Sequence, residues 1–324
     1  MLRSRIIGTG SYAPKKVVTN RDLERMVETS DEWIASRTGI SERRVADGEN
    51  ASEMAAKSGK AALRAAGVSP KDIDLVVVGT VTSQMIFPST ACFVQAALGI
   101  RAGTPAFDVS AACSGFLYAL DVADKYVRSG AAKKALVIGV DVFSRIIDWS
   151  DRGTCVLFGD GAGAVVISAE KGSHGVLSSN IHSDGRYWDM LYAPGSARSN
   201  PFEKTECASG FLKMNGNETF KIAVRTMGGA ITEALEGANL RPDDISLLIP
   251  HQANLRIITA IRDRLKLSDD RVFTNLDRYG NTSAGSIPLA LDEAVAAGKV
   301  SAGDIIVFVA FGGGLTWASA AVRW

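Results

Sequence analysis

The sequence of 324 residues is poor in the residues that most often build metal and redox sites. Its histidines and cysteines are His174, His182, His251, Cys92, Cys113, Cys155 and Cys207. No two cysteines form a C-x-x-C pair, which argues against a zinc site and a disulfide framework and indicates a reducing compartment. We therefore expect no metal, and few side chains compete for acid–base catalysis.

Charge of one sign and long hydrophobic runs are also lacking. The net charge is +1, so no overall field draws the protein to nucleic acid or to a membrane, and a charged partner must meet a local patch. The apolar runs at 136–140 and 305–311 are too short to span a bilayer. Residues 3–7 lack the apolar core of a signal peptide. We expect a cytoplasmic protein, or a stromal one if a transit peptide has been removed.

What the sequence does contain is an alternation of apolar runs with helical patterns. Predicted strands, several of them continuously apolar, lie at 74–79, 106–110 and 135–140, and helical patterns lie at 53–66 and 88–99. Such alternation predicts an α/β fold with a mainly parallel sheet that is covered on both faces. Residues 189–209 have no clear pattern, and we expect a surface excursion over a site there.

Two glycine-rich motifs look like nucleotide-binding loops, but their surroundings argue against that function. Residues 8–13 match G-x-G-x-x-A, yet Pro14 follows where the dinucleotide fingerprint needs a helix. Residues 159–163, Gly-Asp-Gly-Ala-Gly, lie between β-like runs, with no helix to provide N–H groups for a phosphate. We predict a glycine-rich turn at the first motif and a tight turn between strands at the second.

The second half of the chain repeats the order of the first. Pro-Lys-Asp-Ile-Asp-Leu at 70–75 resembles Pro-Asp-Asp-Ile-Ser-Leu at 242–247, and each follows a helical stretch that ends in glycine. A turn of small residues follows each motif some distance on, at 111–114 and 280–285. The repeat predicts a duplicated α/β unit, with halves at 1–172 and 173–324.

The turn at 111–115, Ala-Ala-Cys-Ser-Gly, contains a candidate nucleophile. Cys113 lies between a predicted strand and a predicted helix that runs to about Ser129, and a helix N-terminus favours thiolate over thiol. Equivalent strand ends of packed halves converge, which brings His251 and Asn281 toward Cys113. The alternatives are a cysteine and a histidine that only pack in the core, and an asparagine that only serves a turn. All three coinciding with the triple glycine at 312–314, whose N–H groups are open to a bound oxygen, favours a site.

These motifs together resemble those of the β-ketoacyl-acyl-carrier-protein synthase III family, the initiating condensing enzymes of type II fatty acid synthesis. The resemblance runs along essentially the whole chain, and its most specific stretches are 29–34, 151–154, 250–256, 280–283 and 312–314. It implies a thiolase-like α/β fold with two duplicated βαβαβαββ-type halves, packed as a layered αβαβα sandwich. It also implies a homodimer without a cofactor, whose partners are acyl-CoA and malonyl-acyl carrier protein.

The resemblance implies a role for each catalytic residue. Cys113 attacks the acyl-CoA thioester and becomes acylated, while the backbone N–H groups of Cys113 and Gly313 hold the oxyanion. Malonyl-acyl carrier protein then loses CO2, and His251 and Asn281 donate hydrogen bonds to the enolate oxygen. Elongating synthases have a second His in place of Asn281, thiolases a second Cys, and hydroxymethylglutaryl-CoA synthases use a Glu.

The resemblance also implies three sets of binding residues. The set for CoA is Thr29, Trp33, Arg37, Arg152 and Asn254, with the adenine between Trp33 and Arg152. The set for the acidic carrier protein is Gln252, Arg256, Lys221 and Arg264. The set for the acyl chain is Phe143, Phe158 and Met214 with Phe87 of the other subunit, and the Phe143 ring favours short primers. Alternatively, Trp33 only packs against the body, and the basic residues form only a solvated face.

Two other functions are compatible with these motifs. The first is a synthase of the same fold that condenses an unusual starter in polyketide or quinolone-type biosynthesis. The second is a non-catalytic subunit that pairs with an active partner, although such subunits usually lose the cysteine that this chain has at position 113.

Overall fold

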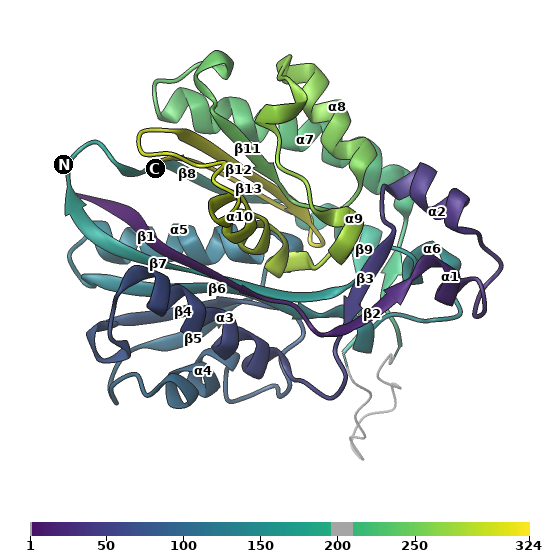
Figure 1. The fold of residues 1–324 in the computed structure, drawn as a ribbon, viewed down its shortest axis with the longest axis horizontal. Helices are drawn as coiled ribbons and strands as arrows, with labels where there is room; N and C mark the ends of the chain where they lie inside the picture. The colour runs from purple at the N-terminus through teal and green to yellow at the C-terminus, as the bar shows by residue number, and fades with distance from the viewer. Residues whose placement is uncertain (1, 196–209) are drawn as a thin grey trace.

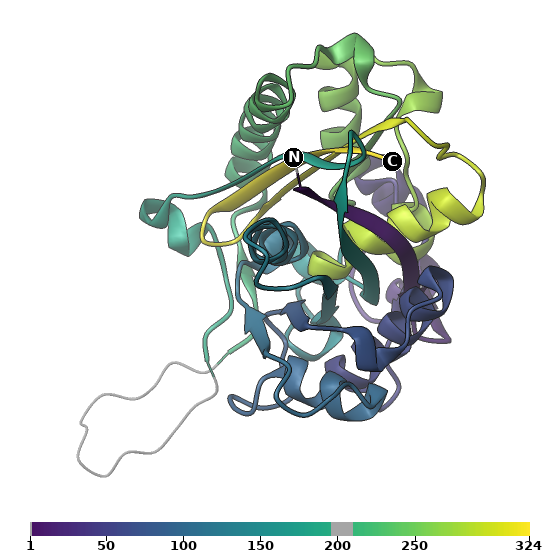
Figure 2. The same ribbon diagram turned by 90° about the vertical axis from the view of Figure 1, so that its left-hand side faces the viewer.

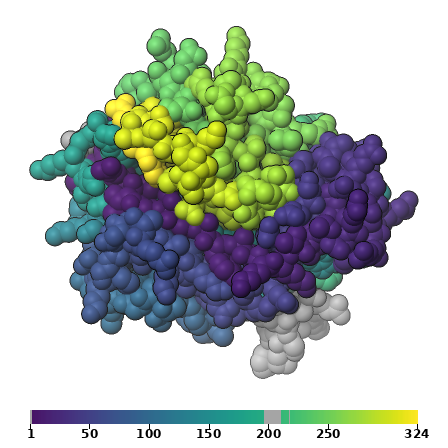
Figure 3. All heavy atoms as spheres, in the orientation of Figure 1, coloured from purple at the N-terminus to yellow at the C-terminus, as the bar shows by residue number. Residues whose placement is uncertain are grey.

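The computed structural model describes residues 2–195 and 210–324, and it consists of two mixed sheets with helices between and outside them (Figure 1). The layers run α, β, α, β, α, and the two termini lie near one another (Figures 1 and 2). The fold is the thiolase-like layered α/β sandwich that the sequence predicted. Residues of the two halves meet along a continuous boundary on one face (Figure 3).

The first sheet has five strands in the order β1-β7-β6-β4-β5. Their bounds are β1 Leu2–Tyr12, β4 Leu75–Gly79, β5 Ala106–Val109, β6 Lys134–Val142 and β7 Asp160–Lys171. The pairs β4–β5 and β4–β6 are parallel, whereas β1–β7 and β6–β7 are antiparallel. The prediction of a mainly parallel sheet was therefore wrong, because continuously apolar strands report burial on both faces and not strand direction.

The second sheet has four strands in the order β11-β12-β13-β8. Their bounds are β8 Gly175–Ser183, β11 Leu247–Pro250, β12 Ile305–Gly312 and β13 Thr316–Arg323. Only β11–β12 is a parallel pair. All strands of the first sheet come from residues 2–171 and all of the second from residues 175–323, and this membership supports our proposal of halves at 1–172 and 173–324.

Ten α-helices and two small ribbons complete the described part of the chain. The helices are α1 Asn20–Leu23, α2 Asp31–Thr38, α3 Ala51–Ala66, α4 Thr90–Leu98, α5 Gly115–Arg128, α6 Arg152–Cys155, α7 Gly216–Gly237, α8 Leu255–Leu265, α9 Leu276–Tyr279 and α10 Ser286–Ala296. The ribbons pair β2 Lys16–Thr19 with β3 Glu42–Val45 and β9 Leu191–Tyr192 with β10 Lys213–Met214. None of these helices is both long and apolar enough to cross a membrane.

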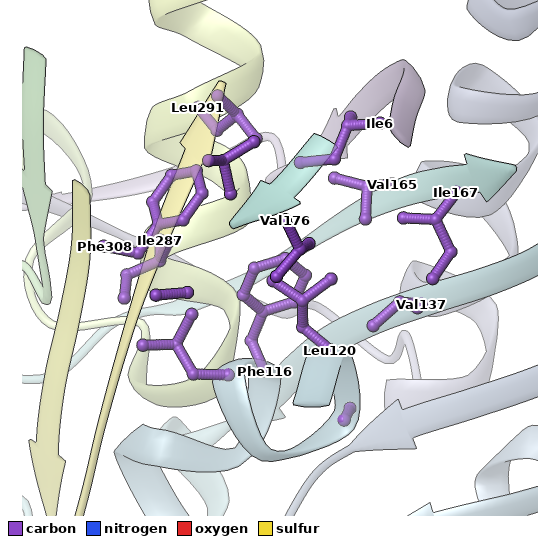
Figure 4. Close-up of a cluster of buried hydrophobic side chains, with 14 of the residues drawn as sticks. Ile6, Phe116, Leu120, Val137, Val165, Ile167, Val176, Ile287, Leu291 and Phe308 are labelled. Atoms are coloured by element: carbon purple, nitrogen blue, oxygen red, sulfur yellow. The ribbon is translucent and has the colours of Figure 1, made fainter. Parts of the chain in front are cut away.

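The central core fills the space between the two sheets (Figure 4). Phe116 of α5 and Ile287 of α10 pack there against Val137 of the first sheet and Phe308 of the second. Neighbouring residues of a strand face opposite ways, so Ile138 joins a separate cluster with α3 and α4. A third cluster joins α7 and α8 to the outer face of the second sheet. The two middle helices, α5 and α10, are therefore the elements that both sheets share.

The two glycine-rich motifs lie inside strands, which corrects both predictions of turns. Residues 8–12 belong to β1 and residues 160–163 to β7. A Cβ at Gly10 would lie 2.3 Å from the Ala62 nitrogen of α3, and a Cβ at Gly163 would lie 2.4 Å from the Leu289 nitrogen of α10. Glycine is needed at these positions because a helix backbone crosses the strand at close range.

Candidate active site

The candidate active site is a cavity of about 640 Å³ whose wall includes Cys113, His251 and Asn281. These residues come from the turn before α5, the end of β11 and the segment after α9. The structure thus brings the three predicted catalytic residues to one cavity, of a size typical of small-molecule sites. Part of segment 189–209, predicted as a surface excursion, also reaches this wall through Leu191, while residues 196–209 lie outside the described residues.

Cys113 lies in a single 3₁₀ turn, Ala112–Ser114, which continues directly into α5. The helix N-terminus is therefore adjacent to the thiol, as the sequence predicted. Burial nevertheless raises the pKa of the thiol to about 12, and the side chains of Ser283 and Asn281 offset this only in part. Because desolvation outweighs these contacts, Cys113 rests as a thiol at neutral pH, and the thiolate expected from the helix dipole is not the resting form.

His251 directly follows β11 and is held by its backbone. Its N–H donates to the Val309 carbonyl at 2.8 Å. The side chain is buried, and burial lowers its pKa from 6.5 to about 4, so the imidazole is neutral at physiological pH. Nδ1 has no hydrogen-bond partner among the described residues. A neutral imidazole has one N–H group and one nitrogen with a lone pair. With the proton on Nε2, the group without a partner at Nδ1 is only a lone pair, and Nε2–H is available to a ligand.

Asn281 is fixed through both its backbone and its side chain. Its N–H donates to Leu157 O at 2.8 Å, and its carbonyl accepts from Gly159 N at 3.0 Å. The side-chain Oδ1 accepts from Ser283 N at 2.9 Å. Since Oδ1 is already bonded within the chain, the Nδ2 donors are the part of the amide that remains for a ligand.

The glycines after β12 give the chain room to pass Cys113. A Cβ at Gly312 would lie 2.7 Å from the Cys113 backbone nitrogen, and a Cβ at Gly313 would lie 2.5 Å from Leu191 O. Any side chain at 312 would press on the nucleophile's backbone. The neighbouring Gly313 N–H remains our candidate for the second oxyanion donor, together with that of Cys113.

The mouth of the cavity carries a stack of one indole and two guanidinium groups. The Arg37 guanidinium lies 4.9 Å from the Trp33 ring centroid, and that of Arg152 lies 5.0 Å from it. Arg152 also donates to the carbonyl of Glu28, which precedes Thr29. Arg152 covers the indole in this structure, so an adenine between the two requires Arg152 to move outward. Thr29 does not line the cavity, although its buried hydroxyl has no partner among the described residues.

The four residues predicted to bind the carrier protein are spread over different environments. Arg256 lines the cavity, and its guanidinium lies 5.4 Å from the Phe220 ring. Lys221 also lines it but pairs with Glu218 at 2.8 Å, and Arg264 lies away from the mouth against α7. Gln252 is only 1% exposed. Its burial conflicts with the prediction that it contacts a carrier protein. The neighbouring Asn254, which was predicted to bind CoA, lines the cavity.

The residues predicted for the acyl pocket divide into inner and outer members. Phe158 and Met214 line the cavity, and Phe143 stacks behind Phe158 with ring centroids 4.7 Å apart. Phe143 therefore supports the wall without forming its surface. Phe87 is 82% exposed and lies outside the cavity of its own chain. A role for Phe87 in an acyl pocket requires a second subunit.

The sequence analysis missed two buried polar residues beside the site. Asp141 accepts hydrogen bonds from Val81 N at 2.9 Å, from Thr82 Oγ1 at 2.8 Å and from Ala284 N at 3.2 Å, and burial raises its pKa. Ser283 lies close enough to lower the pKa of both Asp141 and Cys113. Ser283 lies in the specific stretch 280–283 but received no role from it, and no spacing rule points to Asp141, because its partners are distant in the sequence. Within the described ranges, no three His, Cys, Asp or Glu side chains group as metal ligands.

Comparison with known proteins gives a consistent family relationship. Residues 107–185 match the model of 3-oxoacyl-[acyl-carrier-protein] synthase III, and residues 235–324 match its C-terminal model. The chain is 52% identical over 100% of both sequences to the β-ketoacyl-[acyl-carrier-protein] synthase III of Alkalilimnicola ehrlichii.

Solved structures with similar folds extend this relationship. The 3-oxoacyl-[acyl-carrier-protein] synthase III of Aquifex aeolicus has 50% identity and a TM-score of 0.92, covering 99% of this chain and 100% of that one. A priming β-ketosynthase from a polyketide biosynthetic pathway has 36% identity and a TM-score of 0.90, covering 99% and 96%.

Proposed function

The chain belongs to the 3-oxoacyl-[acyl-carrier-protein] synthase III family, and we propose that it initiates fatty acid synthesis by condensing an acyl-CoA primer with malonyl-acyl carrier protein. It is an acyltransferase of the condensing type. The observation that carries the proposal is that Cys113, His251 and Asn281, from three segments, line one cavity. The products are a 3-oxoacyl-acyl carrier protein, CO2 and CoA.

In the first half-reaction, Cys113 Sγ attacks the thioester carbonyl of acyl-CoA. Because the thiol is the resting form, its proton must leave as the C–S bond forms, and it ends on the departing CoA sulfur. The backbone N–H groups of Cys113 and Gly313 stabilise the oxyanion, and the product is an acyl-Cys113 thioester.

In the second half-reaction, malonyl-acyl carrier protein loses CO2 and leaves a thioester enolate. His251 through Nε2–H and Asn281 through Nδ2 donate hydrogen bonds to the enolate oxygen. The enolate carbon attacks the acyl carbonyl, the Cys113–acyl bond breaks, and the released sulfur takes up a proton from solvent. Neutrality of His251 suits this step, because an uncharged imidazole with its proton on Nε2 donates a hydrogen bond to the enolate oxygen.

The substrates enter through the mouth that Trp33, Arg37 and Arg152 form. Flat cationic and aromatic groups suit an adenine, and Asn254, which lines the same cavity and donates to Arg37 O at 3.1 Å, is our candidate contact for the pantetheine. Exposed Arg256 beside the mouth is the leading contact for an acidic carrier protein. Phe158, backed by Phe143, limits the inner end and favours a short primer such as acetyl-CoA.

We also propose a cytoplasmic homodimer. The segment before Pro88 exposes several large apolar side chains, namely Val81, Met85, Ile86 and Phe87. Such a contiguous set is typical of a surface that another chain covers. A second subunit seated there supplies Phe87 to the acyl pocket, as the family resemblance implies.

The test is to follow the two half-reactions separately. Wild-type protein incubated with acetyl-CoA should gain one acetyl group in intact-mass spectrometry, and adding malonyl-acyl carrier protein should release CO2 and yield acetoacetyl-acyl carrier protein. His251→Ala should still acquire some acetyl group but release little CO2. A wild type without an acetyl adduct contradicts the proposal. A panel of acyl-CoAs of rising length and branching distinguishes a fatty acid initiator from a synthase for an unusual starter.

A further inference from the structure

We propose that Gln252 is a positioning residue that fixes His251 relative to Asn281 for the decarboxylation step. The inference rests on the proposed function, and it gives this buried side chain a task other than contact with the carrier protein. Gln252 directly follows His251 and joins the segment that carries it to the segment that leads to Asn281.

The hydrogen bonds of Gln252 hold three parts of the chain together. Its backbone N–H donates to Ser286 Oγ at 2.7 Å, at the start of α10. Its side-chain Nε2 donates to Pro250 O at 2.7 Å and to Phe273 O at 3.2 Å, and its Oε1 accepts from Asn275 N at 3.0 Å. The side chain thus folds back around His251 and closes the loop on both sides.

A chain of contacts continues from Asn275 to Asn281. Asn275 Nδ2 donates to Glu293 of α10 at 2.8 Å, and Tyr279 donates to the same carboxylate at 2.6 Å. Burial opposes ionisation of Glu293, but the hydrogen bonds from Tyr279, Arg278 and Asn275 outweigh it and lower its pKa, so Glu293 stays ionised near neutral pH and holds the segment in place. A shift at Gln252 Oε1 therefore reaches the Gly280–Asn281 peptide through a short segment anchored on a helix.

Glutamine is the side chain that meets these requirements. Two carbonyls and one N–H face its amide, so two donors and one acceptor are needed at the end of a three-carbon stem. An ionised glutamate would set a charged acceptor against two carbonyl oxygens. Methionine has a similar volume but no donor, and it would leave buried polar groups of both segments unpaired.

The first test compares Gln252→Met with Gln95→Met. Gln95 is a matched control because its Nε2 also donates to two carbonyls, Arg101 O and Thr104 O, at a place away from the cavity. We expect Gln252→Met to lower the rate of CO2 release about 10- to 100-fold, as sub-ångström displacement of catalytic groups does. Acetylation of Cys113 and the KM for malonyl-acyl carrier protein should stay within about threefold of wild type, since neither depends on the paired donors. Gln95→Met should change none of the three quantities.

The second test uses Gln252→Glu, whose defect should depend on pH. A protonated carboxyl group has one donor and one acceptor and restores part of the network, whereas burial and the facing carbonyls disfavour its ionised form and raise its pKa. Its CO2-release rate relative to wild type should therefore rise at least about threefold as the pH falls from 8 to 6. His251 remains neutral over this range because burial lowers its pKa to about 4.

The outcomes separate this inference from the proposed function. If wild type acetylates and decarboxylates but Gln252→Met only raises the KM for the carrier, Gln252 contacts the carrier and the inference is wrong. A Gln252→Glu variant whose relative rate is flat with pH also overturns it, and this result is available even if Gln252→Met does not fold. If wild type neither acetylates nor decarboxylates, the proposed function itself has failed.

Discussion

The turn before α5 and the turn before α10 share a backbone but differ in chemistry. Each has a non-glycine residue in the left-handed region, Ala112 with φ 45° and Ser283 with φ 50°, at the start of one 3₁₀ turn. Each 3₁₀ turn then leads into a middle-layer helix. At the next position the first turn has Cys113 and the second has Ala284. The Ala284 methyl group packs against Gly115, and a Cβ added at Gly115 would lie 3.2 Å from it.

The difference shows how the two copies of a duplicated unit can take different roles in one site. The first turn supplies the candidate nucleophile, and the second supplies Ser283 beside that nucleophile and Asn281 two residues earlier. The second turn also closes the interface between halves, because Ala284 N donates to Asp141 of the first sheet. Strained backbone of this kind often gathers at active sites, and one such residue lies in each of these two turns.

The largest expected effect comes from removing the thiol of the first turn. Cys113→Ala should lose all acetylation from acetyl-CoA and lower turnover by roughly 10⁴-fold or more, because Cys113 is the one thiol among the described residues that line the cavity. Intact-mass spectrometry measures the adduct. Cys92→Ser, which alters an exposed cysteine away from the cavity, should acetylate normally. An acetyl adduct on Cys113→Ala would show that another residue is the nucleophile.

Next comes the donor that the second turn supplies. Asn281→Asp keeps the shape and the Ser283 contact but replaces the Nδ2 donor with an acceptor, so CO2 release should fall about 100- to 1,000-fold. Acetylation of Cys113 should fall much less. A variant that acetylates poorly but decarboxylates normally would reverse the roles that we assign to the two turns.

His251, which lies in the cavity with both turns, should make stability depend on pH. Its pKa is about 4 in the folded protein and 6.5 as the ordinary value, so the unfolded chain binds more protons between these pH values. The folded state should keep its full stability above about pH 6.5 and lose up to about 3 kcal/mol as the pH falls to 4. Denaturant unfolding of wild type and His251→Asn at several pH values measures this, and equal slopes would argue against a buried neutral imidazole.

A smaller effect is expected where β6 meets the second turn. A Cβ at Gly139 would lie 2.1 Å from Ala284 O, so Gly139→Ala should lower the free energy of unfolding by at least about 2 kcal/mol. Gly229→Ala is the control, since Gly229 is an exposed position of helix α7 and a Cβ there meets nothing within 4 Å. That control should be neutral or stabilising by up to about 1 kcal/mol. Equal stabilities of the two variants would mean that the turn before α10 can shift away from β6 without a loss of stability.

The smallest effect tests whether the two left-handed positions are equivalent. Ala112→Gly and Ser283→Gly each remove the cost of a left-handed side chain but add backbone entropy to the unfolded state, so each should change the free energy of unfolding by less than about 1 kcal/mol. Only Ser283→Gly should also alter the reactivity of Cys113 toward an alkylating agent, because the Ser283 hydroxyl contributes to the pKa of that thiol. If both variants changed the reactivity of Cys113 equally, the change would come from the backbone and not from the Ser283 hydroxyl.

The sequence was a good guide wherever local pattern and chemistry coincide. The repeat of 70–75 at 242–247 corresponds to two 3₁₀ turns, Pro70–Asp72 and Pro242–Asp244, each followed by the strand that leads toward the site. The family, the layered fold and the condensing activity also followed from motifs. Local motifs report these features because each is short and carries its own turn chemistry.

Predictions from sequence patterns were wrong for features that depend on contacts with distant segments of the chain. The glycine-rich motifs at 8–13 and 159–163 were interpreted as turns, yet Gly8, Gly10 and Gly163 lie inside strands where a helix backbone crosses at close range. The pKa of Cys113 depends on burial by both halves, which outweighs the adjacent helix N-terminus. Gln252, predicted to contact the carrier protein, faces inward to three backbone partners.

The sequence by itself determined which residue types meet, because motif order in a duplicated chain predicts which strand ends converge. Only the tertiary structure decided their state: a protonated Cys113, a neutral His251 and an Asn281 whose Oδ1 accepts from Ser283 N. The physical reason is that desolvation and hydrogen-bond geometry depend on groups from distant segments that close over the site.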